Sequence, residues 1–254
     1  MVLKTDVHVS IENLSLRYRE KGVLHHISAG IPRHRVTAVI GPSGCGKTSL
    51  LRCINRLIDL VPGATVDGRV NLDGVDIYGR NVDVTEIRKR MGLIAQKPVL
   101  LPMSIFENVA YGPRIFGTGG KKKLHETVER ALTAVGLWNE VSNRLKEPAT
   151  RLSIGQQQRL CLARGLAVEP EVLLFDEPTS ALDPRSAIVI EDEISRLKEE
   201  YTCVVVTHNL RQATRIADYV LFISEGILVE SGSALDVLQS PKEVETQAYL
   251  CNEV

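Results

Sequence analysis

The segment 36–48 restricts the fold of this chain more than any other part of its sequence. A short run of apolar and β-branched residues leads into a glycine-rich turn, and a helix is expected to begin at Lys47. The turn has the spacing G-x-x-x-x-G-K-[S/T], in which backbone N–H groups can face a phosphate because no Cβ blocks them. The helix start behind the turn adds the positive end of its dipole. The segment therefore predicts a phosphate-binding loop, made of Gly41, Pro42, Ser43, Gly44, Cys45, Gly46, Lys47, Thr48 and Ser49.

Two side chains of this loop carry the expected chemistry. Lys47 is placed to reach the β- and γ-phosphates of a nucleoside triphosphate, and the Thr48 hydroxyl is placed to ligate Mg²⁺. The alternative is an ordinary glycine-rich turn with a surface lysine. The strand pattern before the loop and the apolar helix pattern after it favour the phosphate loop. We therefore expect the chain to bind a nucleoside triphosphate.

Charge and hydropathy exclude several classes of protein. Lys and Arg together number 31, and Asp and Glu together also number 31, so the net charge is close to zero. A protein that coats nucleic acid would have a basic surplus. No apolar run approaches the roughly 18 to 20 residues that cross a bilayer, and the sequence does not begin with a signal-peptide pattern. We expect a cytosolic chain with no nucleic-acid partner and no membrane span of its own.

The cysteines indicate reduced thiols. They are five in number and scattered, without a C-x-x-C pair, which argues against a disulfide framework and against a zinc site. Cys45 is a special case because it lies inside the predicted phosphate loop at a helix start. Thiols in that position tend to have a lowered pKa. We therefore expect Cys45 to be reactive, and bound nucleotide to protect it from alkylation.

The order of predicted elements indicates an α/β fold with a mainly parallel sheet. Residues 7–40 alternate apolar and polar, as antiparallel strands do. Strand patterns stop near residue 96 and give way to helical spacing. After residue 166, buried-strand runs alternate with helices, which is typical of a parallel sheet with both faces covered. We expect one domain over 1–254, with an α/β core and antiparallel β subdomain from 1–95 and 167–254, and an inserted helical subdomain from 96–166.

Two carboxylates follow one of these buried strands directly. Four apolar residues end at Asp176 and Glu177, and the carboxyl ends of parallel strands are where such sheets bind ligands. Asp176 is expected to hold Mg²⁺, directly or through water. Glu177 is placed to orient or deprotonate an attacking water. A pair of loop-end carboxylates without function is the alternative, and the phosphate loop elsewhere in the chain argues against it.

Further motifs follow the phosphate loop in a fixed order. Gln96 comes after a strand, LSIGQ begins at residue 152, LLFDEP at 173 and SALD at 180, and His208 follows VVVT. This series resembles the ATPases of the ATP-binding-cassette (ABC) transporter family, over essentially the whole chain. Before the resemblance is considered, Ser153 is simply a helix N-cap, Tyr18 a strand aromatic, and His208 a structural histidine.

The resemblance implies a role for each of these residues. Tyr18 matches the aromatic that stacks on adenine, and Asp183 the aspartate at the dimer interface. His208 matches the histidine that contacts the γ-phosphate. Gln96 matches the glutamine that approaches Mg²⁺ and the attacking water. The implied catalytic set is therefore Lys47, Gln96, Glu177 and His208, and the implied Mg²⁺ set is Thr48, Gln96 and Asp176.

The resemblance also implies a homodimer. In the family two subunits pair head to tail, so that the signature residues of one subunit reach the ATP held by the other. Here the signature residues are Ser153, Gly155 and Gln156. The family usually has LSGGQ, and Ile154 stands here in place of the first glycine. If that position needs a positive φ or a close backbone approach, the substitution weakens catalysis; in ordinary helical backbone it changes little.

Several stretches are more specifically similar to the ATP-binding subunit of bacterial phosphate importers, among them GPSGCGK at 41 and QQQRLCLARG at 156. That resemblance implies ATP-driven phosphate import with two membrane permease subunits and a solute-binding protein, at the cytoplasmic face of the membrane. Alternatives are an importer for another small solute, and an ATP-gated regulatory module with weak hydrolysis. Ile105, Phe106, Val109 and Tyr111 are a candidate docking wall for the membrane partners, or else ordinary core residues.

Overall fold

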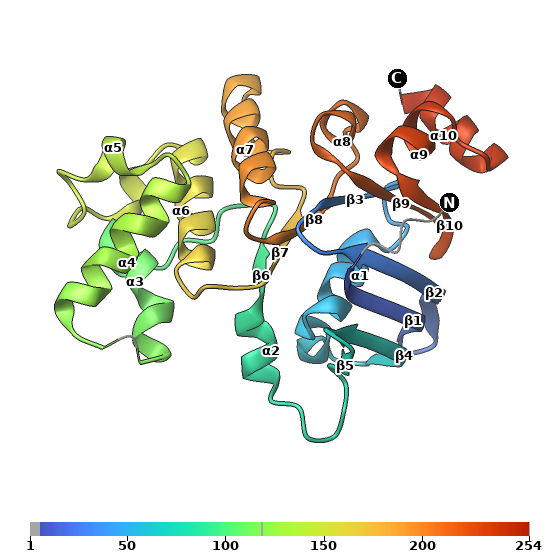
Figure 1. Ribbon diagram of the computed structural model, residues 1–254, viewed down its shortest axis with the longest axis horizontal. Helices are drawn as coiled ribbons and strands as arrows, with labels where there is room; N and C mark the ends of the chain where they lie inside the picture. The colour runs from blue at the N-terminus through green and yellow to red at the C-terminus, as the bar shows by residue number, and fades with distance from the viewer. Residues whose placement is uncertain (1–5, 118, 254) are drawn as a thin grey trace.

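Two β-sheets organise the computed structural model, which describes residues 6–117 and 119–253 (Figure 1). The smaller sheet is antiparallel, in the order β2–β1–β4–β5. The larger sheet has the order β10–β9–β3–β8–β7–β6, in which β10 is antiparallel to β9 and all other neighbours are parallel. The strands are β1 (Val7–Tyr18), β2 (Lys21–Pro32), β3 (Val36–Ile40), β4 (Ala64–Leu72), β5 (Val75–Asp76), β6 (Met91–Ile94), β7 (Val172–Asp176), β8 (Thr202–Val206), β9 (Tyr219–Ser224) and β10 (Ile227–Ser233).

The helices are α1 (Lys47–Ile54), α2 (Val84–Arg90), α3 (Ile105–Ile115), α4 (Lys121–Ala134), α5 (Trp138–Val141), α6 (Ile154–Leu166), α7 (Pro184–Leu197), α8 (Leu210–Ile216), α9 (Ala234–Gln239) and α10 (Val244–Glu253). Short 3₁₀ turns span Leu57–Leu60 and Ala149–Arg151. The predicted α/β class, with a mainly parallel sheet, an antiparallel sheet and a group of helices, is confirmed. Among the described residues, no helix is long and apolar enough to cross a membrane.

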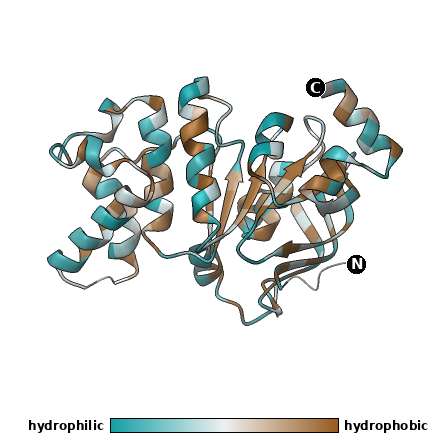
Figure 2. Cartoon of the chain, turned by 45° about the horizontal axis from the view of Figure 1, so that its top comes forward, coloured by the Kyte–Doolittle hydropathy of each residue, from teal (hydrophilic) through white to brown (hydrophobic). Residues whose placement is uncertain are grey.

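The central strands are apolar without interruption because both faces of their sheet are covered. In β7, Leu173 and Phe175 pack on one side, and Val172 and Leu174 pack on the other. This alternation follows from the two-residue period of a strand. The first side meets α7 and the helices of the 96–166 region. The second side meets α1 and the antiparallel sheet. Figure 2 shows the resulting apolar strands between helices whose outer sides are hydrophilic.

The helices α3 to α6 pack together at one end of the molecule, to the left in Figure 1. The core that they form is continuous with one face of the central sheet. The prediction that Ile105 and Val109 belong to a docking wall is wrong, because both side chains are fully buried in this core. Phe106 packs against the same core and stacks on His125, with the ring centroids 5.6 Å apart. Only Tyr111 remains well exposed, at 43%. Helical spacing identified the apolar face of α3, but it does not show whether the core of the chain or a partner covers that face.

Candidate active site

The predicted phosphate loop joins β3 to α1 in a conformation that requires glycine. Gly41, Gly44 and Gly46 have φ values of 145°, 81° and 105°, a region in which other L-residues are strained. A Cβ on Gly41 would come within 1.9 Å of the Ile223 carbonyl oxygen, and one on Gly46 within 2.7 Å of Leu24. Gly46 caps α1 without a side-chain hydrogen bond. The first N–H groups of α1 therefore remain available for an anion.

A hollow of about 220 Å³ opens over this loop. It is lined by Val23, Ser43, Gly44, Gly46, Lys47, Thr48, Ser49 and Glu177. Lys47 is only 5% exposed, and its ammonium donates to the carbonyl oxygens of Gly41 (2.7 Å) and Pro42 (2.8 Å). Val23, from β2, is a wall residue that the sequence analysis missed. Nothing in its local sequence marks it, because it reaches the hollow through the packing of β2 beside α1.

Thr48 and Asp176 meet in the way that an oxygen-ligated cation site requires. The Thr48 hydroxyl donates to the Asp176 carboxylate at 2.7 Å, although the two residues are 128 positions apart. Burial raises the pKa of the Asp176 carboxyl; the Thr48 hydrogen bond opposes this shift, and the charge of Glu177 adds to it. Hydroxyl and carboxylate oxygens are hard donors of the kind that Mg²⁺ prefers. These two residues therefore fit a bound Mg²⁺.

Glu177 connects the sheet edge to two further predicted residues. Its carboxylate accepts from the Gln96 amide at 3.1 Å and lies 3.2 Å from His208 Nδ1. The residue itself has a φ of 48°, a conformation rare for a non-glycine residue, and its N–H donates to the Val206 carbonyl at 3.0 Å. Such backbone strain is found preferentially at functional sites. The structure thus brings Gln96, Glu177 and His208 together beside the phosphate loop.

Tyr18 is the last residue of β1, and it lies beside the phosphate loop. Its hydroxyl is 3.2 Å from the Ser49 hydroxyl, and its partly buried ring packs against the core under the antiparallel sheet. The contact places the aromatic ring near the phosphate loop, where the resemblance expects an adenine-stacking residue.

The expectation of a low thiol pKa at Cys45 is wrong. The side chain is 7% exposed, and burial raises the pKa of the thiol above its usual value. The Lys47 ammonium, 3.9 Å from the sulfur, favours the thiolate but does not outweigh the burial. A helix start lowers a thiol pKa when the sulfur is accessible to water. The sequence shows the helix start but not the burial.

The predicted signature residues form the start of α6. Ser153 is the N-cap: its hydroxyl accepts from Gln156 N–H at 3.3 Å, and the Gln156 side chain accepts from Ser153 N–H at 3.0 Å. This reciprocal pair is a capping box. Ile154 is the first residue of α6 in ordinary helical backbone, with its side chain 54% exposed. A Cβ on Gly155 would lie 3.0 Å from the Ser186 hydroxyl, so the glycine that permits close approach is Gly155 and not the position of Ile154.

Asp183 is the N-cap of α7. Its carboxylate accepts from the N–H groups of Arg185 (3.0 Å) and Ser186 (3.1 Å). The Ser186 hydroxyl also donates to it, and these hydrogen bonds hold the pKa of the Asp183 carboxyl below its usual value. Ser186 therefore donates a hydrogen bond to Asp183 and also lies close to Gly155, the glycine of the signature segment.

The predicted site residues fall into two groups. In the first group, the phosphate loop and Glu177 line the hollow, Asp176 contacts Thr48, and Gln96 and His208 contact Glu177. The signature residues form the second group and do not line the hollow: they begin α6, which belongs to the helices on the left of Figure 1, whereas α1 lies beneath the central sheet. The first group has the hydrogen-bond donors and the carboxylates that a nucleotide-hydrolysing site requires.

Known proteins are similar to this chain in sequence. A family model described as ABC transporter matches residues 24–180. A phosphate import ATP-binding protein PstB 1 of Vibrio parahaemolyticus is 52% identical, covering 95% of this chain and 89% of its own. The PstB protein of Thermotoga maritima is 51% identical, covering 97% and 98%.

A solved structure agrees at the level of the fold. A bacterial Atm1-family ABC exporter with ATP bound superposes with a TM-score of 0.81 at 27% identity. The match covers all of this chain and 43% of the exporter chain. The family match, the two relatives and the geometry of the phosphate loop lead to one conclusion: the chain belongs to the ABC transporter family.

Proposed function

We propose that this chain is the ATP-hydrolysing subunit of an importer for inorganic phosphate. One observation carries the hydrolytic part: Thr48 and Asp176 are in contact, and Glu177 with Gln96 and His208 lies beside the same phosphate loop. The import of phosphate is supported by the relatives, which are named phosphate import ATP-binding proteins and align over 95% and 97% of the chain.

Each residue of the site has a distinct task in this proposal. Lys47 and the α1 N–H groups bind the β- and γ-phosphates of ATP. Thr48 and Asp176 would hold Mg²⁺, with Gln96 beside them, and the bound ion would neutralise charge at the phosphates. Glu177 orients the attacking water and accepts its proton. His208 holds Glu177 and contacts the γ-phosphate, and Tyr18 stacks on the adenine.

The working unit in this proposal is a head-to-tail homodimer. Ser153, Gly155 and Gln156 of one subunit complete the ATP site on the phosphate loop of the other, with Asp183 at the interface. The start of α6 suits this task because a helix N-terminus with a serine donor favours anions. The 96–166 region then moves with the signature helix, relative to the core formed by 1–95 and 167–254.

The membrane partners in this proposal are two permease subunits, which receive solute from a solute-binding protein outside the cell. The chain itself would lie peripherally on the cytoplasmic face of the membrane. Exposed apolar side chains follow Gln96, namely Val99, Met103, Tyr111 and Ile115, at 61%, 39%, 43% and 62% exposure. In this proposal these exposed side chains contact the permeases, and the buried Ile105 and Val109 do not.

Two variants test the hydrolytic proposal. We expect Glu177→Gln to retain ATP binding and to lose at least roughly 100-fold in turnover, since a positioned general base contributes 10²–10⁴-fold. Glu225→Gln is a matched control, because Glu225 is an exposed glutamate whose φ of 47° nearly equals the 48° of Glu177. Turnover is measured with the purified chain. Equal turnover of Glu177→Gln and the native chain would refute the assigned role.

The solute is tested in bacterial cells that lack their own phosphate-importer ATPase. The cells receive this chain with matched permeases, and uptake of radiolabelled phosphate is measured. Uptake with the native chain and with Glu225→Gln, but not with Glu177→Gln, supports phosphate import. ATP turnover without phosphate uptake, in cells where the complex assembles, would favour an importer of another solute. Absence of turnover in the purified dimer would favour the ATP-gated regulatory module.

A further inference from the structure

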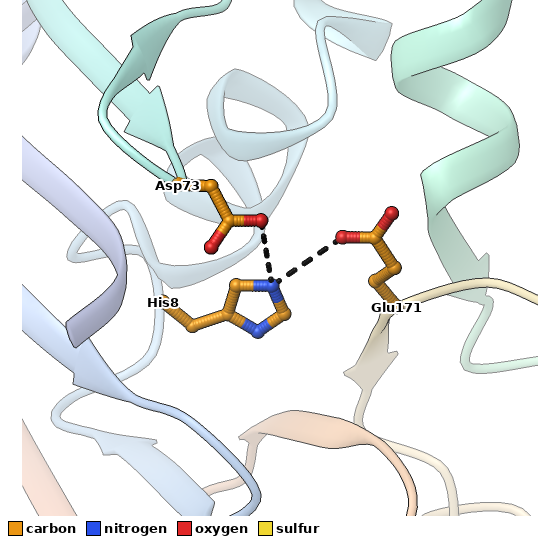
Figure 3. A group of neighbouring side chains, drawn as sticks. All are labelled: His8, Asp73 and Glu171. Atoms are coloured by element: carbon orange, nitrogen blue, oxygen red, sulfur yellow. Dashed lines mark ion pairs between the residues drawn. The ribbon is translucent and has the colours of Figure 1, made fainter. Parts of the chain in front are cut away.

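A histidine and two carboxylates meet at the end of the central sheet opposite the active site (Figure 3). His8 belongs to β1, Asp73 to the turn between β4 and β5, and Glu171 immediately precedes β7. Glu171 therefore lies at the amino end of the strand whose carboxyl end bears Asp176. The cluster is separate from the active site and joins the antiparallel sheet to the central sheet.

The His8 ring has a nitrogen without a hydrogen bond. The side chain is 2% exposed, and Nε2 has no hydrogen-bond partner within the described part of the chain. Nε2 faces Asp73 Oδ2 at 3.6 Å and Glu171 Oε2 at 3.5 Å. N–H···O hydrogen bonds are usually 2.7–3.2 Å long. A buried polar atom of this kind calls for a partner between it and the two carboxylates.

The other ring nitrogen has a partner that can fix the tautomer. His8 Nδ1 lies 2.7 Å from the Thr202 hydroxyl oxygen, which also accepts from His34 N–H at 3.0 Å. A hydroxyl oxygen has two acceptor lone pairs, so it can accept from both. With the proton on Nδ1, the lone pair of Nε2 points at the two carboxylates. Protein-bound metals usually have histidine ligands held in this way through the second ring nitrogen.

The separations of the donor atoms suit a bound metal ion. Zinc bonds to His nitrogen and carboxylate oxygen are roughly 2.0–2.2 Å long, which in a tetrahedral site separates the donors by about 3.3–3.6 Å. The two distances from Nε2 agree with this range, and all three donor atoms lie within 4.8 Å of one another. Asp73 and Glu171 are 37% and 39% exposed, and their terminal torsions are broad, so that the carboxylates can close on an ion.

We propose that His8 Nε2, Asp73 and Glu171 form a binding site for a divalent transition metal such as Zn²⁺. Imidazole with two carboxylates is a donor set for first-row divalent ions, and water completes the coordination. The ion would tie β1 and the β4–β5 turn to the amino end of β7. Because it binds the folded chain, it would stabilise that chain by mass action.

Arg90, at the end of α2, competes with the metal ion for the same oxygens. Its Nη2 lies 3.2 Å from Asp73 Oδ2 and 2.7 Å from Glu171 Oε2. Its Nε contacts the other Glu171 oxygen at 2.6 Å, and Arg33 pairs with the other Asp73 oxygen. Metal binding would leave these outer contacts in place and displace Arg90 Nη2. Removing the Arg90 charge should therefore tighten metal binding.

The alternative is an ion-pair network without a metal. If the Thr202 hydroxyl donates to Nδ1, the proton of the ring lies on Nε2 and faces the two carboxylates. Arg33 and Arg90 then complete a closed set of charges. In this arrangement Zn²⁺ finds no lone pair on His8, and removal of Arg90 creates no metal site.

The test is equilibrium dialysis of the full chain, free of metal and nucleotide, against Zn²⁺. We expect one site per chain that Asp73→Asn and Glu171→Gln each weaken at least tenfold. Asp67→Asn is the matched control. Asp67 also lies on the antiparallel sheet and pairs with an arginine, Arg17, but its side chain is 62% exposed. Arg90→Gln should tighten binding severalfold, whereas Arg17→Gln should not change it. Thermal unfolding without metal checks that each variant is folded.

Two further measurements complete the test. Zn²⁺ should raise the melting temperature of the native chain but not that of Glu171→Gln, and bound Co²⁺ should give the visible absorption of a tetrahedral site. The proposal is overturned if Asp73→Asn and Asp67→Asn bind Zn²⁺ equally, or if the native chain has no such site. It is also overturned if binding is lost in Asp176→Asn instead, because the ion then occupies the active site. None of these metal-binding measurements needs ATP, so their result is independent of the proposed transport function.

Discussion

The helices α1 and α6 both begin at segments that we propose bind phosphate, but their starts are built differently. At α1, glycines in left-handed conformations turn the backbone, and no side chain caps the helix. At α6, Ser153 and Gln156 satisfy each other's N–H groups in a capping box. The first start opens onto a hollow of its own chain, with Lys47 and Thr48 in its wall. The second belongs to the helices on the left of Figure 1, and its residues do not line that hollow. In the proposed dimer, each chain would therefore supply two different half-sites.

The largest effect is expected at the α1 start. Lys47→Ala removes a nearly buried ammonium that would meet the phosphates, and charge-assisted hydrogen bonds of this kind are strong. We expect ATP affinity to fall roughly 100-fold, in line with the loss of one partner of a desolvated charge pair. Binding is measured with a fluorescent ATP analogue. Lys122→Ala is the control, since Lys122 is 94% exposed, and equal affinities for both variants would contradict the assignment.

A smaller effect is expected at the α6 start. Ser153→Ala removes the N-cap hydroxyl, which costs about 1 kcal/mol of stability and, in the proposed dimer, a donor to phosphate worth about tenfold in turnover. Ser104→Ala separates the two effects, because Ser104 caps α3 in the same way, accepting from Glu107 N–H at 3.2 Å. Both variants should lower the melting temperature, but only Ser153→Ala should lower ATP turnover. Equal turnover would mean that Ser153 is only a cap.

The smallest effect is expected at Ile154, the residue next to Ser153. Ile154 is helical and 54% exposed, so it needs none of the conformational freedom of glycine. We expect Ile154→Gly to change ATP turnover by less than about twofold and to reduce stability by about 0.5–1 kcal/mol, the helix propensity of glycine. A tenfold rise in turnover would show that the isoleucine side chain obstructs the signature. Turnover and thermal unfolding of the purified chain give both quantities.

Local sequence was enough to predict the phosphate loop and the carboxylate pair of the candidate site. Glycines at fixed spacing and a carboxylate pair after an apolar strand each imply their own structure, because backbone conformation and strand direction follow from a few neighbouring residues. The apolar runs of β3, β7 and β8 likewise predicted a sheet covered on both faces.

Properties that depend on distant packing could not be predicted. The pKa of Cys45 is set by burial, which no local pattern shows. The burial of Ile105 and Val109 depends on which helices cover α3. His8 and Glu171 are 163 positions apart, and only the packing of the two sheets against each other brings them together. Val23 lines the hollow over the phosphate loop because β2 packs beside α1.

The measurement that tests the two half-sites most directly mixes two inactive variants. Lys47→Ala lacks a working phosphate loop, and Ser153→Arg lacks a working α6 start. If the subunits pair head to tail, each mixed dimer holds one site with both native halves. Random pairing should then restore roughly a quarter of native ATP turnover, since half of the dimers are mixed and each has one of its two sites intact. No restoration, with mixed dimers shown to form, would mean that each chain builds its site alone and would contradict the account.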